Sequence, residues 1–218
     1  FLYEDFKYIS PIISKSYMKR YLATKQNILC KKKIRYLGEP IAVVVAKNRY
    51  IAEDAINLIN IETKELEPII DTIKSSNESK NFVHPTLKTN VILERTFSQG
   101  DIKDVNLNEL VSIKKIFKMS RKTPLAMEPR SYVCDVNKRT NELTLYSSTQ
   151  VPGIIKDAIM NYLGINGNQI TVIAPDVGGG FGGKASLYVE ELIVVAIANK
   201  FQTPIKWISD RYEDLLTT

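Results

Sequence analysis

Residues that bind metal ions directly are scarce in this sequence of 218 residues. It contains one histidine, His84, and two cysteines, Cys30 and Cys134, which lie far apart and match no metal-ligand spacing. These counts exclude a zinc cluster and a histidine-rich metal site. We therefore expect two reduced thiols, no metal ligand from this chain and no catalytic residue within it, so that any metal would arrive in a cofactor that brings its own ligands.

Long apolar runs are also missing. The most apolar stretch, Leu192 to Ala198, is far shorter than the ~20 residues that a membrane-spanning helix needs. The first residues, Phe1 to Asp5, include no initiator methionine and no basic region leading into an apolar one, so they do not read as a signal peptide. We expect a cytoplasmic protein without membrane contact, whose sequence is trimmed or cut from a longer one.

Acidic residues are rare only in the first part of the chain. Residues 1–50 carry 11 Lys or Arg and 3 Asp or Glu, whereas the rest carries 19 and 21. The basic part fits either an acidic or nucleic-acid partner or a solvated surface. We favour the solvated surface and expect no nucleic-acid partner, because no nucleic-acid-binding motif accompanies the charge.

Apolar periodicity predicts an α+β protein with helices and strands interspersed. Helices are predicted over residues 17–24, 50–59, 152–163 and 186–199. Strands are predicted over residues 41–46, 110–119, 131–136, 143–147, 168–177 and 204–208. The polar stretch 72–81 is rich in Ser and Asn and is predicted to be a linker, which divides the chain into domains of residues 1–75 and 76–218.

The segment from Gly178 to Lys184 holds five glycines between a predicted strand and a predicted helix. Its amides, together with the helix N-terminus, would suit an anionic group such as a phosphate. The spacing fits the start of a P-loop, but Ala185 stands where Ser or Thr would hold Mg²⁺. A loose G-x-G-x-x-G match and a purely structural glycine turn also remain open from the glycines alone.

Several spaced motifs resemble one family in the same order. They are YLGEPIAVVVA (36–46), MEPR (127–130), STQVP (148–152), APDVGGGFGGK (174–184) and PIKW (204–207) followed by Asp210, Arg211, Glu213 and Asp214. This set resembles the large, molybdopterin-binding subunit of the xanthine dehydrogenase and aldehyde oxidase family of molybdenum hydroxylases, and it is similar to carbon monoxide dehydrogenase large chains. The resemblance covers nearly the whole chain from about residue 34.

The resemblance implies a fold and a cofactor. Residues 1–75 would be the remnant of a hammerhead α/β domain, and residues 76–218 the first part of a molybdopterin-binding α+β domain. The family hydroxylates aldehydes, heterocycles or carbon monoxide with water. The implied cofactor is molybdopterin, expected in a dinucleotide form, with iron–sulfur clusters and FAD only in partner subunits. Its implied binding residues are Gly179, Gly180, Phe181, Gly182 and Gly183.

The resemblance also has gaps. The family's general-base glutamate and later cofactor loops have no counterpart here, so we expect a partner chain to supply them and no activity from this chain alone. The stretch 120–126 lacks the His or Gln that many members carry before MEPR. Lys184 could pair with a carboxylate or be solvated, and for Glu128 and Arg130 an ordinary salt bridge is favoured over a cofactor contact. Phe181 could line a pocket or pack in the core.

The alternative functions are a non-catalytic truncated or assembly protein that retains the fold and a nucleotide-binding module, which Ala185 disfavours.

Overall fold

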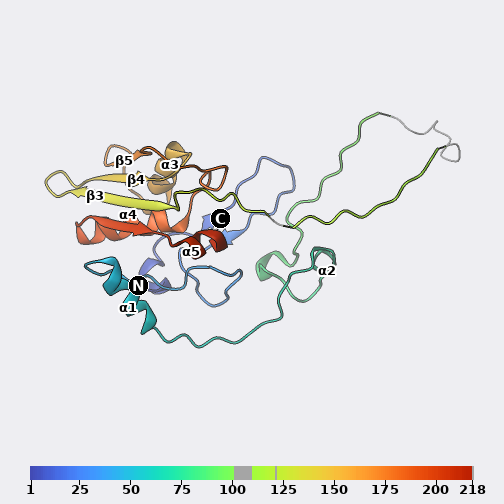
Figure 1. Cartoon of the computed structure of the whole chain (residues 1–218), viewed down its shortest axis with the longest axis horizontal. Coiled ribbons are helices and arrows are strands. Elements are labelled where there is room, and N and C mark those ends of the chain that lie inside the picture. Colours follow the sequence, from blue (N-terminus) through green and yellow to red (C-terminus); the bar gives the residue numbers. More distant parts are fainter. Residues whose placement is uncertain (101–109, 121, 218) are drawn as a thin grey trace. The chain divides into compact units, whose positions relative to one another are not determined.

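The computed structural model describes residues 1–100, 110–120 and 122–217 (Figure 1). The chain divides into two compact units. The larger one comprises residues 1–14, 24–68 and 123–218, and the smaller one comprises residues 15–23 and 69–122. Helices and strands are interspersed, so the predicted α+β class is confirmed.

The larger unit is built on a four-stranded sheet with the order β5-β4-β3-β6. Strand β3 (Ser131–Asn137) pairs antiparallel with both β4 (Glu142–Ser147) and β6 (Ile205–Ile208), and β4 pairs parallel with β5 (Ile170–Ile173). The β3–β4 hairpin turns at Asn141, whose φ of 59° is left-handed, a conformation that asparagine tolerates better than most residues. Alternate residues along β3 and β4 are buried, as expected for a sheet with one covered face.

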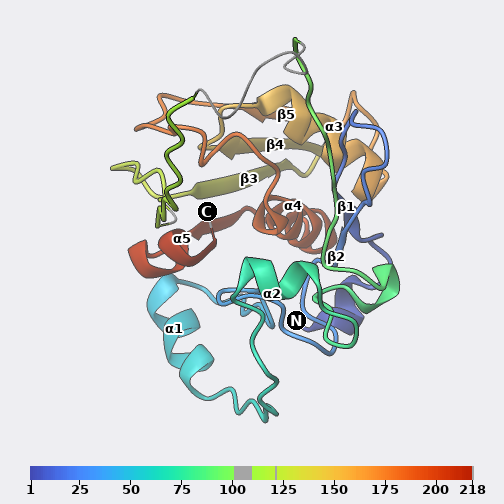
Figure 2. The same ribbon diagram turned by 90° about the vertical axis from the view of Figure 1, so that its right-hand side faces the viewer.

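Two helices cover that face (Figure 2). Helix α4 (Val189–Phe201) packs on β3, β4 and β6, and helix α3 (Pro152–Leu163) packs on β5 and on α4. Helix α3 begins with proline and ends at Gly164 in a left-handed conformation, the usual start and stop signals. Helix α4 is buried on nearly every side, since ten of its thirteen residues are buried and eight of those ten are apolar.

The N-terminal part of the larger unit adds short elements around the same core. They are the 3-10 turn η1 (Tyr3–Phe6), the strand pair β1 (Ile12–Ile13) and β2 (Lys25–Gln26), and helix α1 (Arg49–Asn57). Helix α5 (Arg211–Thr217) follows β6. The core combines residues of the N-terminal segment with residues of the sheet, α3 and α4, among them Phe6, Ile9, Leu29, Tyr132, Leu145, Ile159, Leu192 and Val195.

The smaller unit contains helix α2 (Thr72–Ser76) and the 3-10 turn η2 (Pro85–Leu87). The Asp71 carboxylate caps α2 by accepting hydrogen bonds from the backbone N–H groups of Ile73 and Lys74, each at 3.0 Å. The prediction that residues 72–81 form an irregular linker is therefore wrong for its first half. The domain boundary between residues 75 and 76 stays a prediction.

Three further predictions of local structure are wrong. Residues 17–24 form turns and loops where a helix was predicted. Residues 41–46 and 110–119 are extended but are not strands, since neither segment joins a sheet in the described part of the chain. In residues 41–46 the backbone pairing is limited to Val43, which exchanges hydrogen bonds with Phe1. Among the described residues, no helix is long and apolar enough to cross a bilayer.

Candidate glycine-loop site

The glycine-rich segment from Gly178 to Lys184 lies between β5 and α4, but it does not run directly from strand to helix. Strand β5 ends at Ile173, and α4 begins only at Val189. The loop turns through left-handed conformations at Gly179 (φ 96°) and Gly182 (φ 92°). Glycine adopts this conformation without steric cost, which accounts for its use at these two positions.

Glu128 holds the entrance of the loop. Its Oε2 accepts a hydrogen bond from the Gly178 N–H and a second from the Lys184 ammonium, both at 2.8 Å. The side chain of Lys184 is 3% exposed and that of Glu128 is 32% exposed, so the lysine is buried in this ion pair and the alternative of a solvated lysine is wrong. A Cβ on Gly178 would lie 2.6 Å from the Glu128 Cβ, so the close approach of the two segments requires glycine here.

Gln150 holds the tip of the loop. The side-chain Oε1 accepts a hydrogen bond from the Gly182 N–H at 3.0 Å, and the backbone N–H of Gln150 donates to the Lys184 carbonyl at 2.9 Å. The side chain also lies against Gly180, where a Cβ would come within 2.5 Å of Oε1. Gln150 and Glu128 therefore hold the loop from two different segments.

The tip of the loop presents donors and an aromatic ring. Phe181 is 77% exposed and has a φ of 49°, so the alternative of a core-packing role is wrong. The N–H groups of Gly180 and Phe181 make no hydrogen bond with any described residue. Two successive free amides beside an exposed ring form a surface that can donate to acceptor atoms of a ligand.

The N-terminus of α4 is not an anion site. Its first turn carries Glu190 and Glu191, both buried, and the Glu191 Oε2 accepts the Tyr188 N–H at 3.1 Å. Burial raises the pKa of Glu191 to about 7, against the hydrogen bonds donated by Ser147 and by the Tyr188 N–H. The expectation that the helix terminus joins the loop in binding an anion is wrong, because carboxylates already occupy it. A P-loop is disfavoured for the same reason.

A buried arginine ties the MEPR segment to α4 and α5. The Arg130 guanidinium donates to Asp214 at 3.1 Å and to Glu190 at 3.4 Å, and it lies 4.0 Å from the centre of the Tyr188 ring. Burial raises the pKa of Glu190, and the charge of Arg130 opposes that effect. Arg211 donates to the Ala126 and Met127 carbonyls at 2.8 and 2.7 Å. These contacts support a structural salt bridge for Arg130 over a contact with the cofactor.

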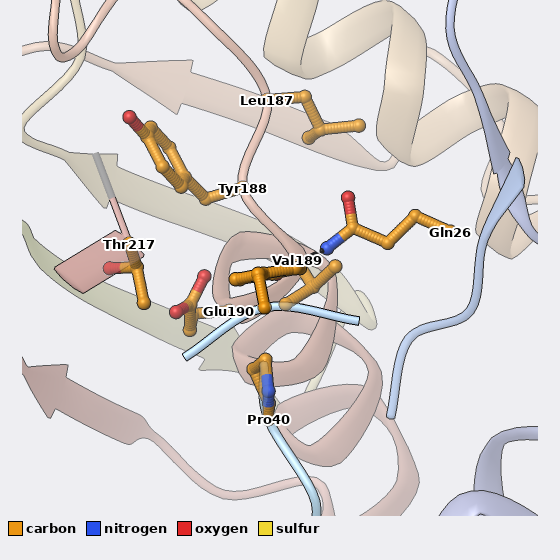
Figure 3. A pocket seen from close by; sticks show the side chains of 8 residues that line it. Gln26, Pro40, Leu187, Tyr188, Val189, Glu190 and Thr217 are labelled. Carbon is orange, nitrogen blue, oxygen red and sulfur yellow. Dashed lines mark hydrogen bonds between the residues drawn. The ribbon is translucent and has the colours of Figure 1, made fainter. Parts of the chain in front are cut away.

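A small cavity of about 110 Å³ lies at the start of α4 (Figure 3). The Gln26 amide donates a hydrogen bond to the Tyr36 hydroxyl at 2.9 Å. Other lining residues include Glu190 and Thr217. The cavity has room for a few water molecules but not for a pterin, so it is separate from any cofactor site.

In the described part of the chain, the thiols and carboxylates offer no reactive centre or metal site of their own. Burial raises the pKa of the Cys134 thiol to about 12 and also raises that of Cys30, so neither is a thiolate near neutral pH. Both cysteines are free. Among the described residues, no three His, Cys, Asp or Glu side chains are grouped so that they could hold a metal ion.

The structure brings the spaced sequence motifs together. The five predicted cofactor residues, 179–183, form one continuous loop tip, and their cofactor role stays a prediction. MEPR and STQVP contact that loop through Glu128 and Gln150, and the segment after PIKW contacts the MEPR segment through Arg211. Sequence reasoning did not assign a role to Gln150 or to Tyr188, whose hydroxyl donates to the Gly183 carbonyl. The position of Gln150 inside the STQVP motif was the sequence feature that could have indicated its role.

Two family models match the chain. Residues 83–218 match the molybdopterin cofactor-binding domain. Residues 10–67 match the α/β hammerhead domain of aldehyde oxidase and xanthine dehydrogenase.

Characterised proteins match over most of this chain. The nicotine 6-hydroxylase large subunit of Paenarthrobacter nicotinovorans is 34% identical over 87% of this chain and 23% of its own length. The carbon monoxide dehydrogenase large chain of Afipia carboxidovorans is 30% identical over 93% of this chain and 27% of its own length. The chain thus spans about a quarter of the length of these relatives.

A solved structure matches the fold closely. The chain of quinoline 2-oxidoreductase from Pseudomonas putida 86 superposes with a TM-score of 0.90 and 31% identity. The match covers 98% of this chain and 27% of that one.

Proposed function

The chain belongs to the molybdopterin cofactor-binding domain family, and on this premise we propose that it forms part of the cofactor-binding large subunit of a molybdenum hydroxylase. The proposed reaction is the hydroxylation of an aldehyde, a heterocycle or carbon monoxide with water as the oxygen source. The names of the relatives support this range, since they act on nicotine, carbon monoxide and quinoline.

The glycine-loop tip carries this proposal. The free N–H groups of Gly180 and Phe181 indicate a ligand with acceptor atoms. Gly179 and Gly182, which have a left-handed backbone, carry no Cβ that would block its approach. Residues 179–183 would hold the cofactor, and the exposed Phe181 ring would form an apolar wall beside it. The residues present therefore fit a molybdopterin.

The other residues around the loop position it. Glu128 and Lys184 fix its entrance, and Gln150 fixes its tip, so that the two free amides are presented in one arrangement. When bound, the molybdenum cofactor supplies the redox centre at which oxygen from water is transferred to the substrate. Among the described residues, a general base is not apparent near the loop tip, so catalysis would need a base from outside the described residues.

The remaining features of the assembly are part of the same proposal. The cofactor is proposed to be a dinucleotide form, and iron–sulfur clusters and FAD are proposed to lie in partner subunits that receive the electrons. A further polypeptide would carry the loops that complete the site. The two free cysteines are consistent with a cytoplasmic location.

The first test is the molybdenum content of the protein purified from its source under mild conditions, measured by elemental mass spectrometry with the co-purifying chains identified. The expected result is near-stoichiometric molybdenum together with a chain that carries the completing loops. Absence of molybdenum and of such a chain would contradict the proposal and favour a non-catalytic or assembly protein.

A substitution at the loop tip sharpens this test. Gly180→Ala places a Cβ within 2.5 Å of the Gln150 Oε1, so Gln150 must move and release the Gly182 N–H. Molybdenum content should fall by about tenfold, as for other changes that disturb the support of a metal site. The matched control is Gly153→Ala in α3, where an added Cβ meets nothing within 4 Å. Equal molybdenum content in both variants would contradict the role of the loop.

A further inference from the structure

Residues 180–183, at the tip of the glycine loop, form a tight turn. The Gly183 N–H donates to the Gly180 carbonyl at 2.8 Å, which closes the turn. Both central residues have a positive φ, 49° at Phe181 and 92° at Gly182. Positive φ at both central positions is characteristic of a type I′ turn. The two free amides, those of Gly180 and Phe181, are the N–H groups of the first two residues of this turn.

Phe181 does not favour this conformation by itself. Type I′ turns prefer Asn or Asp at the first central position and Gly at the second, because a bulky side chain is strained at positive φ. Gly182 meets this preference, whereas Phe181 does not. A strained residue of this kind persists only where the surrounding structure holds it in place. The turn therefore needs contacts from outside the loop.

Tyr188 supplies such a contact at the end of the turn. Its hydroxyl donates to the Gly183 carbonyl, which accepts no other hydrogen bond in the described part of the chain. Burial raises the pKa of the Tyr188 phenol, and the charge of Arg130 opposes that effect. The hydroxyl thus stays protonated and remains a donor at neutral pH. Gly183 is bonded twice, to Gly180 within the turn and to Tyr188 outside it.

Tyr188 is itself fixed to the folded core of the larger unit. Its N–H donates to the Glu191 Oε2 at 3.1 Å, and the Glu191 Oε1 accepts the hydroxyl of Ser147, the last residue of β4, at 2.7 Å. The Arg130 guanidinium lies 4.0 Å from the centre of the Tyr188 ring. Because the backbone and the ring of the tyrosine are both held, the position of its hydroxyl is set by the sheet and by the buried arginine.

We propose that Tyr188 is a positioning residue for the cofactor site: through the Gly183 carbonyl, it locks the turn 180–183 in the conformation that presents the amides of Gly180 and Phe181 to the cofactor. This inference rests on the proposed function, because it identifies the group that orients the proposed cofactor donors. Gln150 holds the middle of the turn at the Gly182 N–H, and Tyr188 holds its end.

The turn can be observed in the full 218-residue chain, which contains only ten glycines. Labelling glycine with nitrogen-15 gives a simple NMR spectrum that reports on the turn, and Gly164 at the end of α3 serves as an internal reference. Tyr188→Phe removes only the hydroxyl and keeps the aromatic ring. We expect hydrogen exchange of the Gly183 N–H to accelerate about tenfold, as for the loss of one supporting hydrogen bond, and exchange at Gly164 to remain unchanged.

Tyr146→Phe is the matched control. Tyr146 lies on strand β4 in the same unit, is 41% exposed, and its hydroxyl makes no hydrogen bond with a described residue. This substitution should leave the exchange of every glycine unchanged. Faster exchange at both Gly164 and Gly183 in Tyr188→Phe would mean that Tyr188 supports the whole fold, and it would overturn the assignment to the turn.

A second substitution separates positioning of the turn from general support of the loop. Phe181→Asn places a preferred residue at the first central position, so the turn forms with less support from outside. In this background, Tyr188→Phe should accelerate the exchange of the Gly183 N–H by less than about threefold. Equal acceleration in both backgrounds would contradict the proposal, because Tyr188 would then not act against the strain at Phe181.

Molybdenum content tests whether the turn serves the cofactor. In the protein purified from its source, Tyr188→Phe should lower the molybdenum content about tenfold relative to Tyr146→Phe. Unchanged exchange of the Gly183 N–H, or unchanged molybdenum content despite faster exchange, would overturn the proposal. Wild-type protein without molybdenum would contradict the proposed function, and the glycine exchange would still test the contact between Tyr188 and the turn.

Discussion

Two segments with similar strand-like patterns differ completely in their surroundings. Residues 131–137 form the central strand β3, paired on both sides, and Cys134 in it is fully buried. Residues 111–120 have a comparable alternation, yet all of them are exposed and none joins a sheet. The alternation therefore specifies which side chains would face a core, but a strand forms only where another strand accepts its backbone hydrogen bonds.

The difference also divides the molecule into a part that is folded by its own contacts and a part that is not. The sheet, α3 and α4 share one core and a network of buried charges around Arg130. The extended segment Val111–Ser120 contributes nothing to that core. Substitutions in the first region should change the free energy of unfolding, and substitutions in the second should not.

The largest expected effect is that of Arg130→Met. Arg130 is fully buried between Asp214 and Glu190, so its loss removes the ion-pair partner of buried Glu190 and one of the partners of Asp214, which also pairs with Arg211. Removing one partner from a buried ion pair costs about 3–5 kcal/mol. Urea unfolding followed by circular dichroism measures the loss, and Arg139→Met in the exposed β3–β4 turn is the control. A loss below about 1 kcal/mol would mean that the network contributes little to stability.

The next effect is a pH dependence that originates at Glu191. Its folded-state pKa is about 7, above the ordinary 4.5, so the folded state binds the proton more tightly. The corresponding stability is complete below pH 4.5 and is lost as the pH rises through about 7, up to about 3 kcal/mol. Glu191→Gln should remove this decline, and the exposed Glu142→Gln is the control. A decline of equal size in Glu191→Gln would assign it to another group.

The elements that pack in the core were predicted from the sequence more accurately than the segments that lie outside the core. Helices α3 and α4 were predicted from apolar spacing, and β3, β4 and β6 from short apolar runs, with ends within a few residues. These elements follow from local patterns because the core they form lies within the chain. The pattern at residues 41–46 also predicted a strand, but the number of neighbouring strands is not encoded in the segment itself.

The candidate site was predictable in its location but not in its contacts. The glycines at 179, 180, 182 and 183 identified the loop, and the motif order indicated the family. The support from Gln150 depends on how STQVP approaches the loop in space, which no spacing in the sequence encodes. Helix α2 was missed although its cap, Asp71, was visible, because the polar residues after it were given more weight.

The smallest expected effect is that of Phe117→Ala in the extended segment Val111–Ser120. Phe117 is 84% exposed, so its removal from the isolated chain should change the free energy of unfolding by less than about 0.5 kcal/mol. Leu145→Ala in strand β4 is the matched comparison, since Leu145 is fully buried and its truncation should cost about 2–5 kcal/mol. Urea unfolding of both variants measures the contrast. A loss above 1 kcal/mol for Phe117→Ala would show that the aromatic ring is already packed in the isolated chain. The segment would then be part of the folded core, and the distinction between the two regions would not hold.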